Sequence, residues 1–366
     1  MIPFLDLKKV NAPYHNEFKA CFVTFLETEN YILGDSVLEF EKAFASYCQV
    51  PFAIGTGNGL DALRLIFEGL KIQKKLNVGD EVLVAANSYI ATVLAIIQAG
   101  LKPVFVEVET QYFNIDLNKI PPVSKTVKAV VVTHLYGQMQ PVSQILAFAE
   151  AHNLILVEDA SQSHGAKLNG KYSGSFGIAA AFSCYPTKNL GALGDAGISV
   201  TSDPQLAELV LKLRNYGRSS LNTNEYLGFN SRLDTVQAQF LNLKLRDLEN
   251  SNRKRYAIAT RYLQEIKNPH IELPYWDYSQ SHVFYVFVVR VKNRTSFISY
   301  LNKLEIGYAI HYPVVAYKQP ALKSYSNLKF EIAEQLADTC ISIPLNTSLS
   351  QRNITLIIAA LNAYEI

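Results

Sequence analysis

The chain has 366 residues, of which 49% are hydrophobic and 18% are charged, and its formal net charge at pH 7 is +2. This composition is typical of a folded globular protein and excludes a disordered chain. The length exceeds the comfortable size of one hydrophobic core, so we expect two domains. Because the nearly balanced charge is spread along the chain, it gives nucleic-acid binding little support.

No segment predicts secretion or insertion into a membrane. Charged residues follow Met1 too closely for a signal peptide, and the longest apolar runs, such as 283–289, have the length of a strand. The four cysteines are scattered without paired or metal-ligand spacing, and the seven histidines are dispersed. We therefore expect a cytoplasmic protein with reduced cysteines and no metal site.

The first two thirds of the chain predict a sheet with alternating helices. Strands are expected at 51–54, 81–85, 103–106, 128–135, 154–159, 178–182 and 197–201, and helices at 15–27, 35–47, 89–99, 142–152 and 204–215. Alternation of this kind indicates an α/β fold, in which a mostly parallel sheet is covered by helices on both faces.

The sequence changes character after a loop rich in glycine and asparagine at 216–231. One long helix is predicted over 234–265, and its basic run Arg253–Arg255 is expected on a solvent-exposed face. A β-rich stretch and short helices follow. We therefore divide the chain into a large domain over 1–233, a connecting helix over 234–265 and a small α+β domain over 266–366.

A glycine-rich stretch at 55–59 lies between a strand and the start of a helix, a geometry that points free backbone N–H groups at an anion. It matches a dinucleotide-binding fingerprint poorly, because the third glycine is missing and no acidic residue ends a strand about 20 residues later. As a cradle for a single phosphate it needs only the amides near Gly59 and Leu60. A plain turn into a helix is the alternative interpretation.

Two charged residues follow buried strands. Asp159 ends the apolar strand at 154–159, at the edge where open α/β sheets hold ligands. A carboxylate in such a crevice needs a cation, and a protonated pyridine nitrogen is one. Lys188 lies in a loop of small residues, separated by Pro186 from the strand before it. Alone, Asp159 could cap a turn and Lys188 could be a solvated lysine.

Together these features match the needs of pyridoxal phosphate (PLP). This cofactor needs an amine for a Schiff base, a carboxylate at its ring nitrogen, an anion cradle for its phosphate and a flat group against its ring. The sequence offers Lys188, Asp159, the loop at 55–60 and Tyr89. Tyr89 alone could equally be a core aromatic residue at a helix start.

Ordered motifs extend this hypothesis over nearly the whole chain. They lie at 2–7 (IPFLDL), 31–34 (YILG), 57–63 (GNGLDAL), 134–138 (HLYGQ), 158–166 (EDASQSHGA), 182–197, 230–234 (NSRLD) and 311–313 (HYP). In these motifs the chain resembles the sugar aminotransferases of the DegT/DnrJ/EryC1/StrS family. The resemblance implies the fold-type I architecture of aspartate aminotransferase, with a mostly parallel mixed sheet.

The resemblance also implies roles at the cofactor. Lys188 would bind PLP covalently and carry the proton during amino transfer, while Asp159 would hold the ring nitrogen. The remaining cofactor contacts would be Gln162 at the ring hydroxyl, Tyr89 stacked on the ring, and Ser183 with the amides of Gly59 and Leu60 at the phosphate. Asn230 matches a residue that reaches the phosphate from the neighbouring subunit, which implies a homodimer with shared active sites.

The motifs predict the residues that contact the substrate less clearly than those that contact the cofactor. Candidates for the sugar or its diphosphate are Tyr185, Arg218, His311 and Tyr312, each of which has an ordinary structural role as its alternative. The run 185–195 resembles enzymes that aminate C-3 of dTDP-3-keto-6-deoxyhexoses, whereas C-4 enzymes usually carry histidine at the position of Tyr185. A lysine at 188 argues against the related dehydratases. Met139, Gln140 and Cys184 depart from the usual residues, which leaves fine specificity open.

We therefore expect conversion of a dTDP-3-keto-6-deoxyhexose into a dTDP-3-amino-3,6-dideoxyhexose, of galacto or gluco configuration, with L-glutamate as amino donor. The product would serve a cell-surface polysaccharide or a glycosylated metabolite. Two alternatives stay open: an aminotransferase that acts at C-4 or on a UDP-linked sugar, and a non-catalytic regulatory member of the family.

Overall fold

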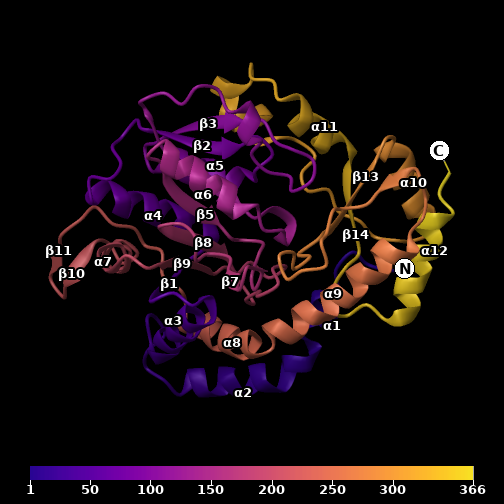
Figure 1. The fold of residues 1–366 in the computed structure, drawn as a ribbon. Helices are drawn as coiled ribbons and strands as arrows, with labels where there is room; N and C mark the ends of the chain where they lie inside the picture. Colours follow the sequence, from indigo (N-terminus) through magenta and orange to yellow (C-terminus); the bar gives the residue numbers. More distant parts are fainter. Residues whose placement is uncertain (366) are drawn as a thin grey trace.

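Figure 1 shows the fold of the chain in a computed structural model, which describes residues 1–365. Its centre is a seven-stranded sheet with the order β1-β9-β8-β5-β4-β2-β3. The strands are β1 (Phe52–Thr56), β2 (Glu81–Ala85), β3 (Lys102–Val106), β4 (Val127–Thr133), β5 (Ile155–Asp159), β8 (Ala179–Ser183) and β9 (Gly197–Thr201). Strand β9 is antiparallel to both of its neighbours, and the other pairs are parallel. The mostly parallel, mixed sheet expected from the sequence is confirmed.

Both faces of this sheet are buried, and each face packs against its own core. Successive side chains of a strand point to opposite faces, so one strand contributes to both cores. In β8, Ala179 and Ala181 belong to one hydrophobic core, while Ala180 and Phe182 belong to another. The first core includes α4 (Gly59–Ile72), α5 (Ile90–Gln98), α6 (Val142–Ala151) and α7 (Pro204–Leu213). The second includes α3 (Asp35–Cys48) and α8 (Thr235–Arg246).

A third core lies in the C-terminal part of the chain. Figure 1 shows it beside α9 (Leu248–Glu265), away from the large sheet. It is built on an antiparallel sheet of β12 (Ile271–Glu272), β13 (Phe287–Val291) and β14 (Cys340–Ile343), with α10 (Arg294–Lys303) and α12 (Gln351–Asn362). In contrast, α11 (Glu331–Thr339) packs into the first core of the large sheet. The domain boundaries themselves stay a prediction.

The remaining elements are short or lie at the periphery. They are α1 (Leu7–Asn11), α2 (His15–Leu26), β6 (Lys167–Leu168), β7 (Lys171–Tyr172), β10 (Arg218–Ser220), β11 (Thr223–Asn224) and the 3-10 helices Ala12–Tyr14, Leu117–Lys119, Leu135–Gly137, Ala316–Lys318 and Pro320–Tyr325.

The single helix expected over 234–265 was wrong, because the chain forms two helices there. Helix α8 ends at Arg246 and α9 begins at Leu248, while Asp247 between them has φ −102° and ψ 0°, away from ordinary helical values. The break lets α8 pack into a core of the large sheet while Ile258 and Tyr262 of α9 pack into the C-terminal core.

The basic run was also predicted wrongly at one of its residues. Arg253 and Lys254 are exposed, but Arg255 is only 5% exposed. Its Nη1 donates to the backbone carbonyls of Phe284, Tyr285 and Leu345, and these bonds hold it inside the protein.

All four cysteines are free, and three of them (Cys48, Cys184 and Cys340) are buried. Within residues 1–365, no group of His, Cys, Asp and Glu side chains is arranged to hold a metal ion. No helix in this range is both long and apolar enough to cross a membrane.

Candidate active site

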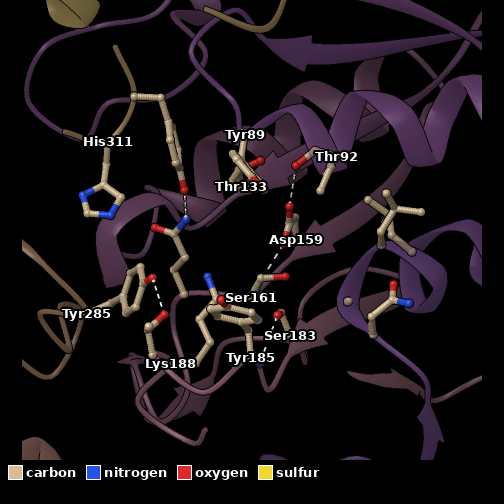
Figure 2. Close-up of a pocket in the computed structure, with 18 of the residues that line it drawn as sticks. Tyr89, Thr92, Thr133, Asp159, Ser161, Ser183, Tyr185, Lys188, Tyr285 and His311 are labelled. Atoms are coloured by element: carbon tan, nitrogen blue, oxygen red, sulfur yellow. Dashed lines mark hydrogen bonds between the residues drawn. The ribbon is translucent and has the colours of Figure 1, made fainter. Parts of the chain in front are cut away.

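A pocket of about 400 Å³ opens where β4, β5 and β8 end (Figure 2). These strand ends supply Thr133, Asp159 and Ser183, and the starts of α4 and α5 supply further lining residues. Every site residue predicted from the sequence lines this pocket, except Arg218 and Asn230. The carboxyl edge of the parallel strands therefore gathers side chains that are far apart in the sequence.

Asp159 is held at both oxygens of its carboxylate. Oδ2 accepts a hydrogen bond of 2.6 Å from the hydroxyl of Thr92, and Oδ1 accepts one of 3.1 Å from the backbone N–H of Ser161. The residue is 8% exposed, and neither of these partners is a cation. A buried charge without a counterion is costly, so this carboxylate is suited to a cationic ligand.

Lys188 lies across the pocket from Asp159, next to an aromatic ring. Figure 2 shows Lys188 and Tyr285 on one side of the pocket, with Thr92 and Asp159 on the other. The Lys188 amine lies 4.4 Å from the centre of the Tyr285 ring, and the Tyr285 hydroxyl is 3.1 Å from Oγ1 of Thr187. These contacts direct the amine into the pocket.

The turn that carries this lysine depends on a glycine. A Cβ atom at Gly191 would lie 2.4 Å from the carbonyl oxygen of Pro186, closer than real Cβ contacts come. The backbone N–H of Lys188 also donates to the carbonyl of Tyr185 at 2.8 Å. Glycine at 191 is therefore needed for this tight loop.

The start of α4 forms an anion cradle beside Ser183. Asn58 caps this helix by accepting a hydrogen bond of 2.8 Å from the backbone N–H of Asp61. The first N–H groups of a helix, here those of Gly59 and Leu60, have no partner within the helix. A Cβ at Gly59 would lie 2.6 Å from the Cβ of Ser183, so only glycine allows this close approach. The geometry fits a phosphate group.

The aromatic rings of Tyr89 and Tyr312 form another wall of the pocket. The rings of Tyr89 and Tyr312 lie 4.7 Å apart between centroids, with an angle of 30° between their planes. Nε2 of Gln162 donates to the Tyr312 hydroxyl at 3.0 Å, and its Oε1 accepts from the backbone N–H of Tyr136 at 2.7 Å. Gln162 therefore orients Tyr312, in addition to the role at the cofactor predicted from the sequence.

His311 adds a neutral polar group to this wall. Its Nδ1 is 2.8 Å from the hydroxyl of Ser342. Burial, together with the charge of Lys188, lowers the pKa of His311 to about 4, so the ring is neutral at neutral pH. A neutral imidazole can exchange hydrogen bonds with a sugar hydroxyl without adding charge.

Arg218 and Asn230 lie outside the pocket of their own chain. Arg218 is an exposed residue of β10, and Asn230 is exposed beside Asn215. The structure thus does not bring these two residues together with Lys188. Their predicted roles stay untested.

The three departures from the usual motif residues also lie outside the pocket lining. Met139 is buried in a small core with Val142, Ala166 and Val283. The Gln140 side chain donates to the carbonyl of Tyr112 at 2.9 Å, and Cys184 is buried in the second core. None of them is placed to contact a substrate directly.

Three residues that shape the site were not predicted from the sequence: Thr92, Ser161 and Tyr285. Thr92 follows Tyr89 by three residues at the start of α5, and Ser161 follows Asp159 by two, so their closeness to predicted residues was the available signal. Tyr285 comes from the C-terminal part of the chain, and no local pattern links it to Lys188.

The residues of the pocket fit PLP. The buried carboxylate without a counterion suits the protonated ring nitrogen, the amine of Lys188 suits the aldehyde, and the start of α4 suits the phosphate. The fold and this pocket define the class of the protein: a fold-type I enzyme that uses PLP.

Comparison with known proteins agrees with this class. The chain belongs to the DegT/DnrJ/EryC1/StrS aminotransferase family, whose sequence model matches residues 14–362. It is 44% identical, over 100% of its own length and 99% of the relative's, to a dTDP-3-amino-3,6-dideoxy-alpha-D-galactopyranose transaminase of Aneurinibacillus thermoaerophilus. The expected family and the expected enzyme class, a sugar aminotransferase, are confirmed.

Two solved structures are similar over nearly the whole chain. The crystal structure of DesV of S. venezuelae in complex with a ketimine intermediate has a TM-score of 0.94 and 36% sequence identity, and the match covers 99% of this chain and 97% of that one. The structure of NtdA of Bacillus subtilis with the bound cofactor PMP has a TM-score of 0.89 and 26% identity, and covers 98% and 84%.

Proposed function

We propose that the protein transfers an amino group from L-glutamate to C-3 of a dTDP-3-keto-6-deoxyhexose. The nitrogen replaces the keto oxygen, which yields dTDP-3-amino-3,6-dideoxyhexose, and glutamate becomes 2-oxoglutarate. The observation that carries the proposal is the buried Asp159, which has no cationic partner among residues 1–365 and lies in one pocket with Lys188. The relative at 44% identity, a dTDP-3-amino-3,6-dideoxy-alpha-D-galactopyranose transaminase, supports the dTDP sugar, position C-3 and the galacto configuration.

Each residue around the cofactor site has a separate task. PLP, when bound, supplies a ring that withdraws electrons from the carbon that loses a proton. Asp159 would keep the ring nitrogen protonated, while Thr92 and Ser161 fix the direction of its carboxylate. Lys188 would hold the cofactor covalently, and its amine would accept a proton from the substrate carbon and return it.

The phosphate is assigned to the start of α4, and the sugar to the aromatic wall. The amides of Gly59 and Leu60 with the hydroxyl of Ser183 would bind the phosphate. Tyr89 would stack on the cofactor ring, and Gln162 would reach its hydroxyl. For the sugar nucleotide we assign Tyr185, which is 52% exposed at the pocket, with His311 and Tyr312.

We also propose a homodimer in which each subunit completes the other's active site. Arg218 and Asn230 lie in motif or loop positions expected to contact ligand, yet both are outside the pocket of their own chain. Large apolar side chains near them, Leu221 and Leu227, are 79% and 97% exposed. Exposed apolar groups of this kind are suited to burial against another subunit.

Mixing two inactive variants tests this dimer. Lys188→Ala removes the amine and Asn230→Ala removes the side chain that would cross to the partner. If sites are shared, each mixed dimer holds one intact site, and random mixing restores about a quarter of the wild-type activity. No restored activity, or a monomer by light scattering, would rule out the shared site. Lys188→Ala alone should also lack the visible absorbance of the Schiff base.

Turnover with NMR of the sugar product tests the reaction. The expected product carries nitrogen at C-3 with the galacto configuration, and 2-oxoglutarate appears in equal amount. Turnover of 4-keto or UDP-linked sugars instead would contradict the proposed substrate. A protein without PLP absorbance or turnover would favour a regulatory role.

The free cysteines agree with our expectation of a cytoplasmic location.

A further inference from the structure

A second cavity, which we call the rear cavity, adjoins the loop of Lys188. Its volume is about 90 Å³, and it shares only Thr187 and Lys188 with the active-site pocket. The other lining residues come from the N-terminal segment (Leu5, Leu7, Lys9, Val10, Pro13 and Tyr14), the loop residues Pro186 and Asn189, α8 and α9 with Asp247 between them, and Thr347. The proposed reaction does not use this cavity.

The rear cavity is strongly cationic. The basic residues in its lining are Lys9, which is paired with Asp6 at 3.3 Å, and Lys244, Lys254 and Arg255. Lys188 also lines it, but its amine is directed into the active-site pocket, and the acidic residue in the lining is Asp247. The carboxylate of Asp247 already accepts a hydrogen bond of 3.0 Å from the hydroxyl of Tyr14. The chain as a whole is nearly neutral, so this concentration of positive charge is local.

Two of these cations are buried. Lys244 is 7% exposed, and its amine donates to the carbonyl of Gly191 and, at 3.2 Å, to Oδ1 of Asn11. Arg255 donates from Nη1 to three backbone carbonyls, while its buried Nε has no partner. None of these partners within residues 1–365 carries a negative charge.

The two cations line the same cavity, and their charges repel each other. Burial, together with the charge of Arg255, lowers the pKa of Lys244 to about 8. Carbonyl oxygens satisfy hydrogen bonds but do not neutralise charge, and buried charges without counterions are costly. The arrangement therefore favours an anion between Lys244 and Arg255.

We propose that the rear cavity binds one small tetrahedral oxyanion of the phosphate or sulfate type. Lys244 and Arg255 supply the buried charges, and Lys254 supplies a third charge at the rim. Ammonium and guanidinium groups are the usual partners of such oxyanions. Because Lys244 also holds the carbonyl of Gly191, the bound anion would stabilise the loop that carries Lys188.

Calorimetric titration of the PLP-loaded enzyme with inorganic phosphate, at constant ionic strength, tests the proposal. Phosphate should bind and raise the melting temperature. Lys254→Met should weaken binding by about tenfold, because it removes a hydrogen bond to a charged group. Arg253→Met is the matched control, because Arg253 is exposed on α9 beside Lys254 but does not line the cavity, so its loss should leave binding unchanged.

Further outcomes separate the rear cavity from the active site. Lys244→Met should abolish phosphate binding while circular dichroism shows a folded protein, and crystals grown with selenate should show the anion between Lys244 and Arg255. Equal phosphate affinity in all variants, or displacement of phosphate by dTDP, would overturn the proposal. A carboxylate of a second subunit seated on these two cations would overturn it as well. The comparison of variants holds whether or not the enzyme turns over dTDP sugars.

Discussion

The hydroxyl of Thr92 donates a hydrogen bond of 2.6 Å to Oδ2 of Asp159. This bond joins the start of α5 to the end of β5, two elements that approach each other only in the folded sheet. The backbone N–H of Ser161 binds the other carboxylate oxygen, so the side chain has one fixed direction. A carboxylate fixed before the ligand arrives loses no further freedom when it binds, which favours both affinity and rate.

Thr92→Val tests this bond, because valine keeps the shape of threonine but lacks the hydroxyl. We expect PLP to bind about tenfold more weakly, since a hydrogen bond to a charged group contributes about 1.5–3 kcal/mol. Fluorescence titration of the apoenzyme with PLP measures the effect. Thr92→Ser keeps the hydroxyl and should stay near the wild type, so equal losses in both variants would contradict the role of the bond.

Gly59→Ala tests the close contact between α4 and β8. The new Cβ would lie 2.6 Å from the Cβ of Ser183 and 2.9 Å from its Cα, so the helix start must move away from the strand. We expect the phosphate cradle to open, the affinity for PLP to fall by about tenfold or more, and the stability to fall by about 1–3 kcal/mol.

Gly57→Ala is the control for this substitution. Its nearest contact would be the flexible hydroxyl of Ser231 at 3.2 Å, so the loss should be clearly smaller. PLP titration and chemical denaturation compare the two variants. A Gly59→Ala protein that binds PLP as tightly as the wild type would show that the cradle lies elsewhere.

The sequence predicted those parts of the site that follow from regular structure. Asp159 and Lys188 were found because a parallel sheet brings its strand ends to one edge. Tyr285 was not found, because its contact with Lys188 depends on how the C-terminal part packs against the large sheet. The burial of Arg255 was missed for the same reason: its carbonyl partners are distant in sequence, and a basic run in a helix is usually exposed.

The break at Asp247 had no local signal either. Good helix-forming residues flank it, and neither glycine nor proline interrupts the stretch from 235 to 265. The two helices pack into different cores on either side of Asp247, and such tertiary demands override helix propensity.

Tyr285→Leu tests the ring beside the catalytic amine. The Lys188 amine lies 4.4 Å from the ring centre, and such cation–π contacts contribute about 0.5–2 kcal/mol. Without the ring the amine is less well placed, so we expect kcat to fall by about threefold to thirtyfold while KM for the sugar nucleotide changes little. Tyr285→Phe keeps the ring and should retain most of kcat. Equal losses in both variants would assign the effect to the hydroxyl and its contact with Thr187.

Buried histidines predict that the protein loses stability between pH 7 and pH 5. Burial lowers the pKa of His164 and of His282 to about 3. Their ordinary value is about 6.5, so below that pH the unfolded chain takes up protons that the folded protein refuses. The free energy of unfolding should therefore fall as the pH drops below 6.5, by about 2 kcal/mol at pH 5 for each of these two histidines.

Urea unfolding at pH 7 and pH 5 measures this loss, in a window that lies above the ordinary carboxyl pKa values of about 4. Burial lowers the pKa of His311 as well, to about 4, so three histidines share this loss. His164→Gln cannot take up a proton, so this variant should lose about a third of the pH dependence even where its stability at pH 7 is lower. His152→Gln is the matched control, because His152 is exposed at the end of α6 and its loss should leave the slope unchanged. Equal free energies of unfolding at the two pH values would show that the buried imidazoles take up protons within the folded protein.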